Sequence, residues 1–280
     1  MKTLDVPGAS LHYETRGAGP VLLLICGGIY DAAGYAGLAG ALADRYTVVT
    51  YDRRGNSRSP LSGPPSVQSV AEHADDASRL LAAVTDQPAF VFGNSSGAQI
   101  GLELAVRHPE QVRALIAHEP PLFGLLPDAA HWESVIADVE RAYRDGGVGP
   151  AMGVFGAAMG MTGDDESPEA SDEAAEAEAP PSPEMLEMFA RFEKNTDFFA
   201  GYEVPGFGRH ALDVEALRGS SVPVVVAAGE QSGGEPPHRA AVALAERLGT
   251  SAEVYPGDHG GFGAEAEAFA ARLDAVFAKA

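Results

Sequence analysis

The sequence has little cysteine, few basic residues and no long apolar run, and each shortage excludes a class of protein. Among 280 residues there is one cysteine, Cys26, so neither an intrachain disulfide framework nor a four-cysteine zinc site can form. This usage is typical of a reducing compartment. The longest clear apolar run, Val21 to Cys26, has the length of a strand and is far too short for a membrane span. We therefore expect a soluble, cytoplasmic protein.

Basic residues are outnumbered by acidic ones. There are 19 Lys and Arg against 40 Asp and Glu, which gives a net charge of −21. This excess argues against nucleic acid and anionic membranes as partners. Nine of the acids fall between positions 164 and 184, where there is no base. Too few apolar residues lie there to offset the ordering entropy, so residues 162–183 are predicted to form a mobile acidic tract, either a solvated loop or a docking site.

The rest of the chain alternates short β-branched apolar runs with longer Ala/Leu-rich segments. This alternation predicts an α/β fold with a mostly parallel central sheet and flanking helices. The expected strands are Leu11–Thr15, Val21–Cys26, Thr47–Tyr51, Ala89–Phe92, Val112–Ala117, Val222–Ala227 and Ala252–Tyr255. The expected helices between and after them are Tyr35–Ala43, Val67–Val84, Ser95–His108, Ala240–Leu248 and Ala264–Ala278.

The alternation is interrupted between positions 120 and 218. This stretch contains helix-like pieces at His131–Tyr143 and Pro183–Glu193 and no strand-like run. We therefore predict a core in two parts, residues 1–120 and 219–280, with an inserted helical cap over residues 121–218. An insertion at this place can cover a site at the carboxyl ends of the strands.

The strongest chemical signal is the five-residue stretch Gly93–Gly97, which reads G-N-S-S-G. It directly follows an expected strand and opens an expected helix, which is the setting of a nucleophile elbow. In such a turn Ser95 stands exposed at the top of the sheet, where the N-terminal dipole of the following helix stabilises developing negative charge.

A serine hydroxyl needs a base to become a nucleophile. In this architecture the base follows the last strand, where Pro256–Phe262 reads P-G-D-H-G-G-F and His259 stands between glycines that allow an exposed turn. Five other histidines lie in polar stretches and are expected at the surface: His12, His73, His108, His131 and His238. His118 is expected to be structural.

The oxyanion of an acyl-transfer reaction needs two backbone N–H donors. One is expected from Ser96, the residue after the nucleophile, and the other from Gly28 in the loop Cys26-Gly27-Gly28 after the second expected strand. Asp52 and Arg54 are expected to organise the turn after the third expected strand.

Together these motifs resemble the α/β-hydrolase superfamily. The glycine loop at Cys26–Gly28, the turn Asp52–Ser57, the elbow at Ser95 and the late His259 all match, over residues 11–120 and 221–278. The resemblance implies a serine hydrolase without metal or organic cofactor. Cys26 departs from the histidine that many relatives have, and we interpret it as a small buried apolar residue.

The acid of the triad is the main departure. Many relatives have an aspartate after the strand that matches Val222–Ala227, and here that position is Ser232. Glu119, which directly follows another strand end, is similar in placement to the triad glutamate of the fungal zearalenone lactonases, whose motifs resemble His118-Glu119-x-Pro121 and the elbow from Gly93 to Ala98. We therefore predict Glu119 as the acid, with Glu230 as the alternative.

These residues predict cleavage of a carboxylic ester or lactone through an acyl-enzyme with the triad Ser95, His259 and Glu119. The expected partner is a small apolar ester or lactone, and the oligomeric state is left open. A cofactor-free C–C hydrolase or haloperoxidase of the same fold uses the same triad and stays an alternative. So does a ligand-binding receptor built on a hydrolase scaffold.

Overall fold

The computed structural model describes residues 2–161 and 182–280. Its centre is an eight-stranded sheet with the order β1-β2-β4-β3-β5-β6-β7-β8. The strands are β1 (Lys2–Val6), β2 (Ala9–Arg16), β3 (Val21–Ile25), β4 (Thr47–Tyr51), β5 (Ala89–Asn94), β6 (Val112–His118), β7 (Val224–Gly229) and β8 (Glu253–Tyr255). Strand β2 pairs antiparallel with both β1 and β4. The other pairings are parallel, so the six strands β4, β3, β5, β6, β7 and β8 form a parallel sheet.

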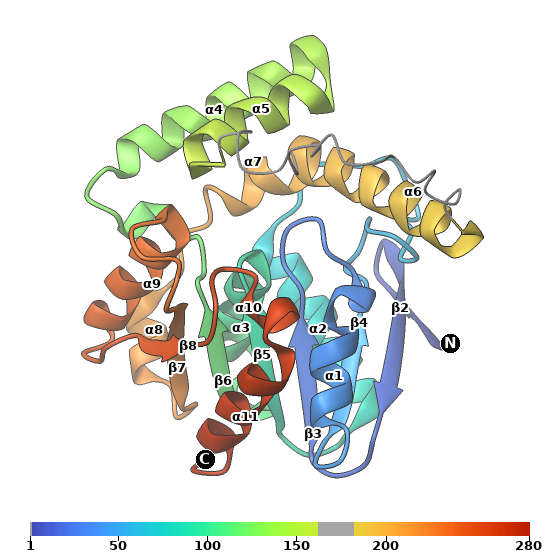
Figure 1. Ribbon diagram of the computed structural model, residues 1–280, viewed down its shortest axis with the longest axis vertical. Helices are drawn as coiled ribbons and strands as arrows, with labels where there is room; N and C mark the ends of the chain where they lie inside the picture. Colours follow the sequence, from blue (N-terminus) through green and yellow to red (C-terminus); the bar gives the residue numbers. More distant parts are fainter. Residues whose placement is uncertain (1, 162–181) are drawn as a thin grey trace, which may run out of the picture.

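Helices cover both faces of this sheet (Figure 1). Side chains of a strand alternate between faces, so Leu22 and Leu24 of β3 pack with α1 (Ala36–Leu42) and α11 (Ala266–Phe277). Leu23 and Ile25 belong to the core on the other face, formed with α2 (Val70–Val84), α3 (Ser96–Arg107), α8 (Val214–Gly219) and α9 (Pro236–Arg247). Three short turns complete the core: η1 (Ala32–Tyr35), η2 (Pro109–Gln111) and α10 (Gly261–Ala264). The predicted α/β architecture is confirmed.

Between β6 and α8 the chain forms helices above the carboxyl ends of the strands (Figure 1). They are η3 (Phe123–Leu125), α4 (Ala129–Gly146), α5 (Val148–Met159), α6 (Pro183–Phe198), η4 (Phe199–Glu203, a π-helical turn) and α7 (Val204–Phe207). We call these elements the cap. Side chains of η3, α4, α5, η4 and α7 share an apolar core, in which the Trp132 ring stacks on Phe123 with 4.2 Å between centroids. Residues 162–181, which make up most of the predicted acidic tract 162–183, lie outside the described residues.

Several elements were not expected from the sequence, among them β1, α5 and the short helices α7, α8 and α10. Strand β1 pairs with β2, and most of its side chains are exposed. Its sequence, KTLDV, therefore contains no continuous apolar run of the kind that predicts a buried strand. Helix α5 contains three glycines, at positions 149, 153 and 156, which lower helix propensity. It is stabilised instead by packing against α4 and η4 in the cap core. Among the described helices, none is long and apolar enough to cross a membrane.

Candidate active site

The turn at Ser95 has the strained backbone of a nucleophile elbow. Ser95 links β5 directly to α3 with φ 56° and ψ −128°, a conformation that costs a non-glycine residue free energy. The close crossing of strand, turn and helix leaves no room for side chains beside it. A Cβ on Gly93 would lie 2.3 Å from the Gly97 carbonyl oxygen, and one on Gly97 would lie 2.1 Å from that of Ile25. The G-x-S-x-G pattern is therefore a steric requirement of this turn.

Glu119 and His259 are hydrogen-bonded to each other. His259 Nδ1 lies 2.6 Å from Glu119 Oε2, although the two residues are 140 positions apart. The Glu119 side chain is fully buried, and its other oxygen accepts hydrogen bonds from the Gly229 amide at 2.9 Å and from the Ser232 hydroxyl. This arrangement places the proton of the neutral imidazole on Nδ1, so Nε2 is left as the basic nitrogen.

Ser232 occupies the position where many relatives have an aspartate, and it contacts Glu119. Its hydroxyl donates to the carboxylate that reaches the same region from β6. Glu230, the alternative acid, is exposed, and its backbone amide donates to the Tyr255 carbonyl. Of the two predicted carboxylates, Glu119 is therefore the one in contact with His259.

The environment of Glu119 favours its ionised form. Burial by itself raises the pKa of this carboxyl, but the hydrogen bond and charge of His259, followed by His118 and Ser232, outweigh burial and lower the pKa to about 2. The carboxylate is therefore ionised at neutral pH.

Ser95 and His259 are joined less tightly than His259 and Glu119. Among the hydrogen bonds of the described residues, none connects the Ser95 hydroxyl to the imidazole. Both side chains are half-buried at the same end of the sheet. Catalytic hydrogen bonds are often long in a structure without ligand and become shorter when substrate binds.

The two predicted oxyanion donors contact each other. The Gly28 amide donates to the Ser96 hydroxyl at 2.9 Å. Ser96 is the first residue of α3, so its own amide has no partner within the helix. A Cβ on Gly27 would lie 2.8 Å from the Ser95 Cβ, which shows how closely the glycine loop approaches Ser95. An acceptor oxygen placed beside these two residues would find the Ser96 amide available and would compete with the Ser96 hydroxyl for the Gly28 amide.

The remaining candidate side chains have structural surroundings. Cys26 is buried, and burial raises its pKa to about 12, which keeps the thiol protonated and unreactive at neutral pH. Burial lowers the pKa of His118 to about 4, and its Nδ1 donates to Asn94 Oδ1 at 2.6 Å. The expectation that His12 and His73 lie at the surface is wrong, because both are buried under tertiary contacts that their local sequence does not reveal.

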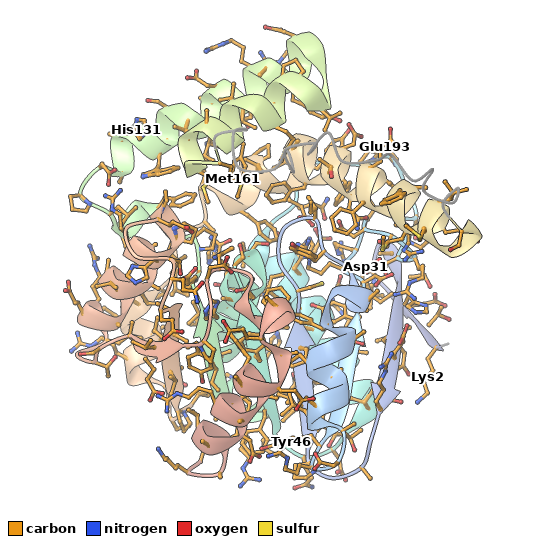
Figure 2. The ribbon with its side chains drawn as sticks, in the orientation of Figure 1. Lys2, Asp31, Tyr46, His131, Met161 and Glu193 are labelled. Atoms are coloured by element: carbon orange, nitrogen blue, oxygen red, sulfur yellow. The ribbon has the colours of Figure 1, made fainter. Side chains whose placement is uncertain are left out.

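A group of cap-to-core contacts was missed by sequence reasoning. Arg53 Nη1 lies 3.0 Å from both oxygens of Glu203, and neither side chain has any exposed surface. Asn195 of α6 donates to the Ile29 carbonyl at 3.0 Å, and Arg191 of the same helix pairs with Asp31 at 3.0 Å. In Figure 2, Asp31 lies just beneath α6. The sequence shows that Arg53 carries a charge, but it indicates neither that this side chain is buried nor that Glu203 is its partner.

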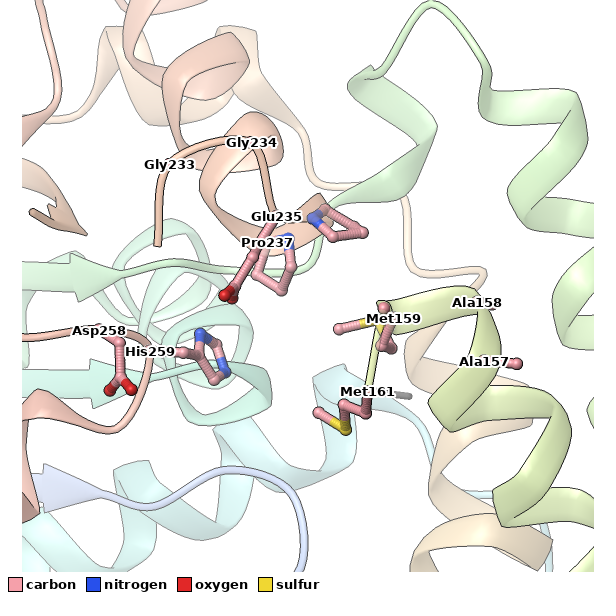
Figure 3. A pocket seen from close by; sticks show the side chains of 12 residues that line it. Ala157, Ala158, Met159, Met161, Gly233, Gly234, Glu235, Pro237, Asp258 and His259 are labelled. Atoms are coloured by element: carbon pink, nitrogen blue, oxygen red, sulfur yellow. The ribbon is translucent and has the colours of Figure 1, made fainter. Parts of the chain in front are cut away.

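One cavity lies at the elbow and another at the histidine. A small cavity of about 50 Å³ is lined by Ser95, Ser96 and Gln99 together with apolar side chains of the cap, including Phe155, Phe199 and Phe207. An open groove of about 650 Å³ runs past His259, with Asp258 and Glu235 on one side and the end of α5 on the other (Figure 3). Met159 lines both. Within the described part of the chain, no cluster of three or more His, Cys, Asp or Glu side chains is arranged to hold a metal ion.

This fold and this strand–turn–helix serine define the class of protein. The family model described as alpha/beta hydrolase fold matches residues 20–262, and the chain belongs to this family of hydrolases. It is 39% identical over 283 residues to the uncharacterized hydrolase YraK of Bacillus subtilis, covering 99% of this chain and 96% of YraK.

Solved structures agree on the fold. A thermophilic esterase from Thermogutta terrifontis superposes with a TM-score of 0.74 at 18% identity, over 100% of this chain and 99% of that one. The enol-lactonase from Burkholderia xenovorans superposes with a TM-score of 0.65 at 18% identity, over 100% of both chains.

Proposed function

We propose that this hydrolase cleaves a carboxylic ester or lactone through an acyl-enzyme, with Ser95 as nucleophile, His259 as general base and acid, and Glu119 as the acid that orients the histidine. The observation that carries the proposal is the 2.6 Å hydrogen bond between His259 Nδ1 and the fully buried Glu119, beside the strained elbow at Ser95. Glu119 accepts hydrogen bonds from the Gly229 amide, the Ser232 hydroxyl and His259. A carboxylate in this place stabilises the positive charge that the imidazole acquires during the proposed reaction.

In the first step His259 Nε2 removes the proton of the Ser95 hydroxyl while the oxygen attacks the substrate carbonyl carbon. The carbonyl π electrons move to its oxygen, which becomes an oxyanion bound by the Ser96 and Gly28 amides. Glu119 stabilises the imidazolium that results. The tetrahedral intermediate then collapses, His259 donates its proton to the leaving oxygen, and the alcohol departs from the acyl-enzyme.

In the second step His259 removes a proton from water, and the hydroxide attacks the acyl carbon. Collapse of this second intermediate returns the proton to Ser95 and releases the carboxylic acid. A lactone follows the same course, except that its leaving alcohol stays attached to the acid. The proposed chemistry uses only groups of this chain and one water molecule.

The cavity at Ser95 supports a substrate with a short apolar acyl group. The cavity at Ser95 is small and lined mainly by aromatic and aliphatic side chains, which suits a short apolar acyl group. The groove at His259 lies where the leaving group must be to receive its proton. The esterase and the lactonase that share this fold act on the two substrate classes in question.

The test is a panel of p-nitrophenyl esters of increasing acyl length, together with small and macrocyclic lactones, measured with the wild-type protein and Ser95→Ala. Turnover of short-chain esters or lactones that depends on Ser95 supports the proposal. Binding without product release would indicate the receptor alternative, and no hydrolysis of any ester or lactone would contradict the proposal. The cytoplasmic location stays a prediction.

A further inference from the structure

Arg53 connects the cap to the loop that carries Gly28. It lies just after β4, and its guanidinium is completely buried. Through Nη1 it contacts both carboxylate oxygens of Glu203 at 3.0 Å, and through Nη2 it donates to the carbonyl oxygen of Gly28 at 2.5 Å. Glu203 ends the π-helical turn η4 of the cap, 150 positions further along the chain. A single side chain therefore joins the cap to one expected oxyanion donor.

The pair is held in a fixed geometry. Asn56 Nδ2 donates to Glu203 Oε1 at 2.8 Å, so the carboxylate has a second partner besides Arg53. A buried ion pair contributes little net stability, because the desolvation of both charges offsets their attraction, whereas removing one partner leaves an uncompensated buried charge. A contribution to stability is therefore a weak explanation for the Arg53–Glu203 pair. The hydrogen bond from Arg53 to the Gly28 carbonyl is a more specific explanation.

Gly28 is a residue that needs such a support. Its φ of +54° lies in the left-handed region, and a Cβ at this position would meet no atom within 4 Å, so neither a side chain nor close packing restrains it. Glycine is also the most flexible residue of the backbone. Its amide is held by the Ser96 hydroxyl on one side, and its carbonyl is held by Arg53 on the other.

We propose that Arg53 and Glu203 are positioning residues. Arg53 holds the Gly28–Ile29 peptide by its carbonyl oxygen, which restrains the backbone torsion angles of Gly28 and thereby keeps the Gly28 N–H, in the preceding peptide, in the orientation needed to stabilise the oxyanion. Docking of the cap then completes the oxyanion site. This inference rests on the proposed hydrolysis through Ser95. Preorganised donors act in the transition state and much less in substrate binding, so loss of the support lowers kcat with little change in KM.

A neighbouring buried arginine–carboxylate pair provides a control. Arg54 Nε lies 2.6 Å from Asp76 Oδ2 of α2, and both side chains are buried. Arg54 also donates to a backbone oxygen, the Pro7 carbonyl at 3.0 Å. This carbonyl lies in the turn between β1 and β2, away from the glycine loop. Asp76→Asn therefore removes one of the two carboxylates that contact this buried arginine, the other being that of Glu72, and it does not touch Gly28.

The experiment compares Glu203→Gln with Asp76→Asn in the full-length protein, at a temperature well below both melting points. We expect Glu203→Gln to lower kcat for p-nitrophenyl butyrate by about 10- to 100-fold with KM within about threefold, and to weaken inhibition by phenylboronic acid, a tetrahedral mimic, by a similar factor. Asp76→Asn should keep kcat within about twofold. Equal losses of kcat in both variants, or a change in KM alone, would overturn the proposal.

A readout without activity separates this proposal from the proposed function. Hydrogen exchange measured by mass spectrometry should become faster in the peptide covering residues 26–31 in Glu203→Gln and stay unchanged there in Asp76→Asn. Unchanged exchange in Glu203→Gln would overturn the positioning role even in an active enzyme. Faster exchange in a protein without esterase activity would support the positioning role while the proposed function fails.

A milder variant covers the case in which Glu203→Gln does not fold. Asn56→Ala keeps the ion pair and removes one hydrogen bond to Glu203. It should lower kcat by about threefold and raise exchange in the same peptide. Wild-type kcat and wild-type exchange in this variant would overturn the proposal.

Discussion

The two halves of the candidate site are supported in different ways. The triad half, with Ser95, Glu119 and His259, is built on strand ends and loops of the core, and its key contacts are made to the backbone and side chains of β7 and the loops that follow it. The oxyanion half, at Gly28, is held by Arg53 and through it by Glu203 of the cap. The contact between Glu119 and His259 is thus made within the core alone, whereas the Gly28 loop, which we propose as part of the oxyanion site, is linked through Arg53 to a residue of the cap.

The largest effect is expected at the nucleophile. Ser95→Ala should lower kcat by several orders of magnitude, because the residual catalysis comes only from binding and the oxyanion site. Folding should be preserved, since alanine is equally small in the elbow. Steady-state kinetics with p-nitrophenyl butyrate and a melting curve measure both. Near-normal turnover in a folded Ser95→Ala protein would contradict the role of Ser95 as nucleophile, and with it the proposed triad.

The next effect concerns the acid. Glu119→Gln should lower kcat by about 10²- to 10⁴-fold, because the amide can present its NH₂ group to the imidazole and favour the wrong tautomer. Glu230→Gln is the matched control, as this side chain is exposed, and its kcat should stay within about tenfold, roughly 1.4 kcal/mol of barrier. If the Glu230 variant were the inactive one, the acid assignment would be wrong and the serine-hydrolase proposal would remain.

The charge of Glu119 also predicts a pH dependence of stability. The pKa of this carboxyl is about 2 in the folded protein against an ordinary 4.5, so its ionisation stabilises the folded state above pH 4.5. This contribution is lost as the pH falls from about 4.5 towards 2. Between pH 7 and pH 3 the wild type should lose about 2 kcal/mol more unfolding free energy than Glu119→Gln. Urea denaturation at the two pH values measures this difference, and equal losses would contradict the ionised, buried carboxylate.

The smallest effect is expected where the two halves touch. Ser96→Ala removes the hydroxyl that accepts the Gly28 amide, so one restraint on the oxyanion loop is lost while the Arg53 contact stays. A hydrogen bond of this kind is worth about 1 kcal/mol, and kcat should fall by up to about tenfold. Ser96→Thr keeps the hydroxyl and serves as control. An increase of kcat in Ser96→Ala would show instead that the hydroxyl competes with the substrate oxygen for the Gly28 amide.

The sequence by itself determined the local parts of this protein. A glycine-flanked serine between a strand and a helix, a histidine between glycines after the last strand, and a glutamate at a strand end are encoded within a few residues, because backbone geometry at strand ends constrains residue size and conformation locally. The missing aspartate at Ser232 was informative in the same way. These signals predicted the α/β fold and the contact between Glu119 and His259.

Only the tertiary structure decided the contacts between distant segments. The pairing of Arg53 with Glu203, the burial of His73 and the hydrogen bond from Gly28 to Ser96 depend on how the cap docks and how loops cross, and no periodicity records them. A buried charge requires a partner, but physical chemistry does not say which of many carboxylates supplies it until the chain has folded.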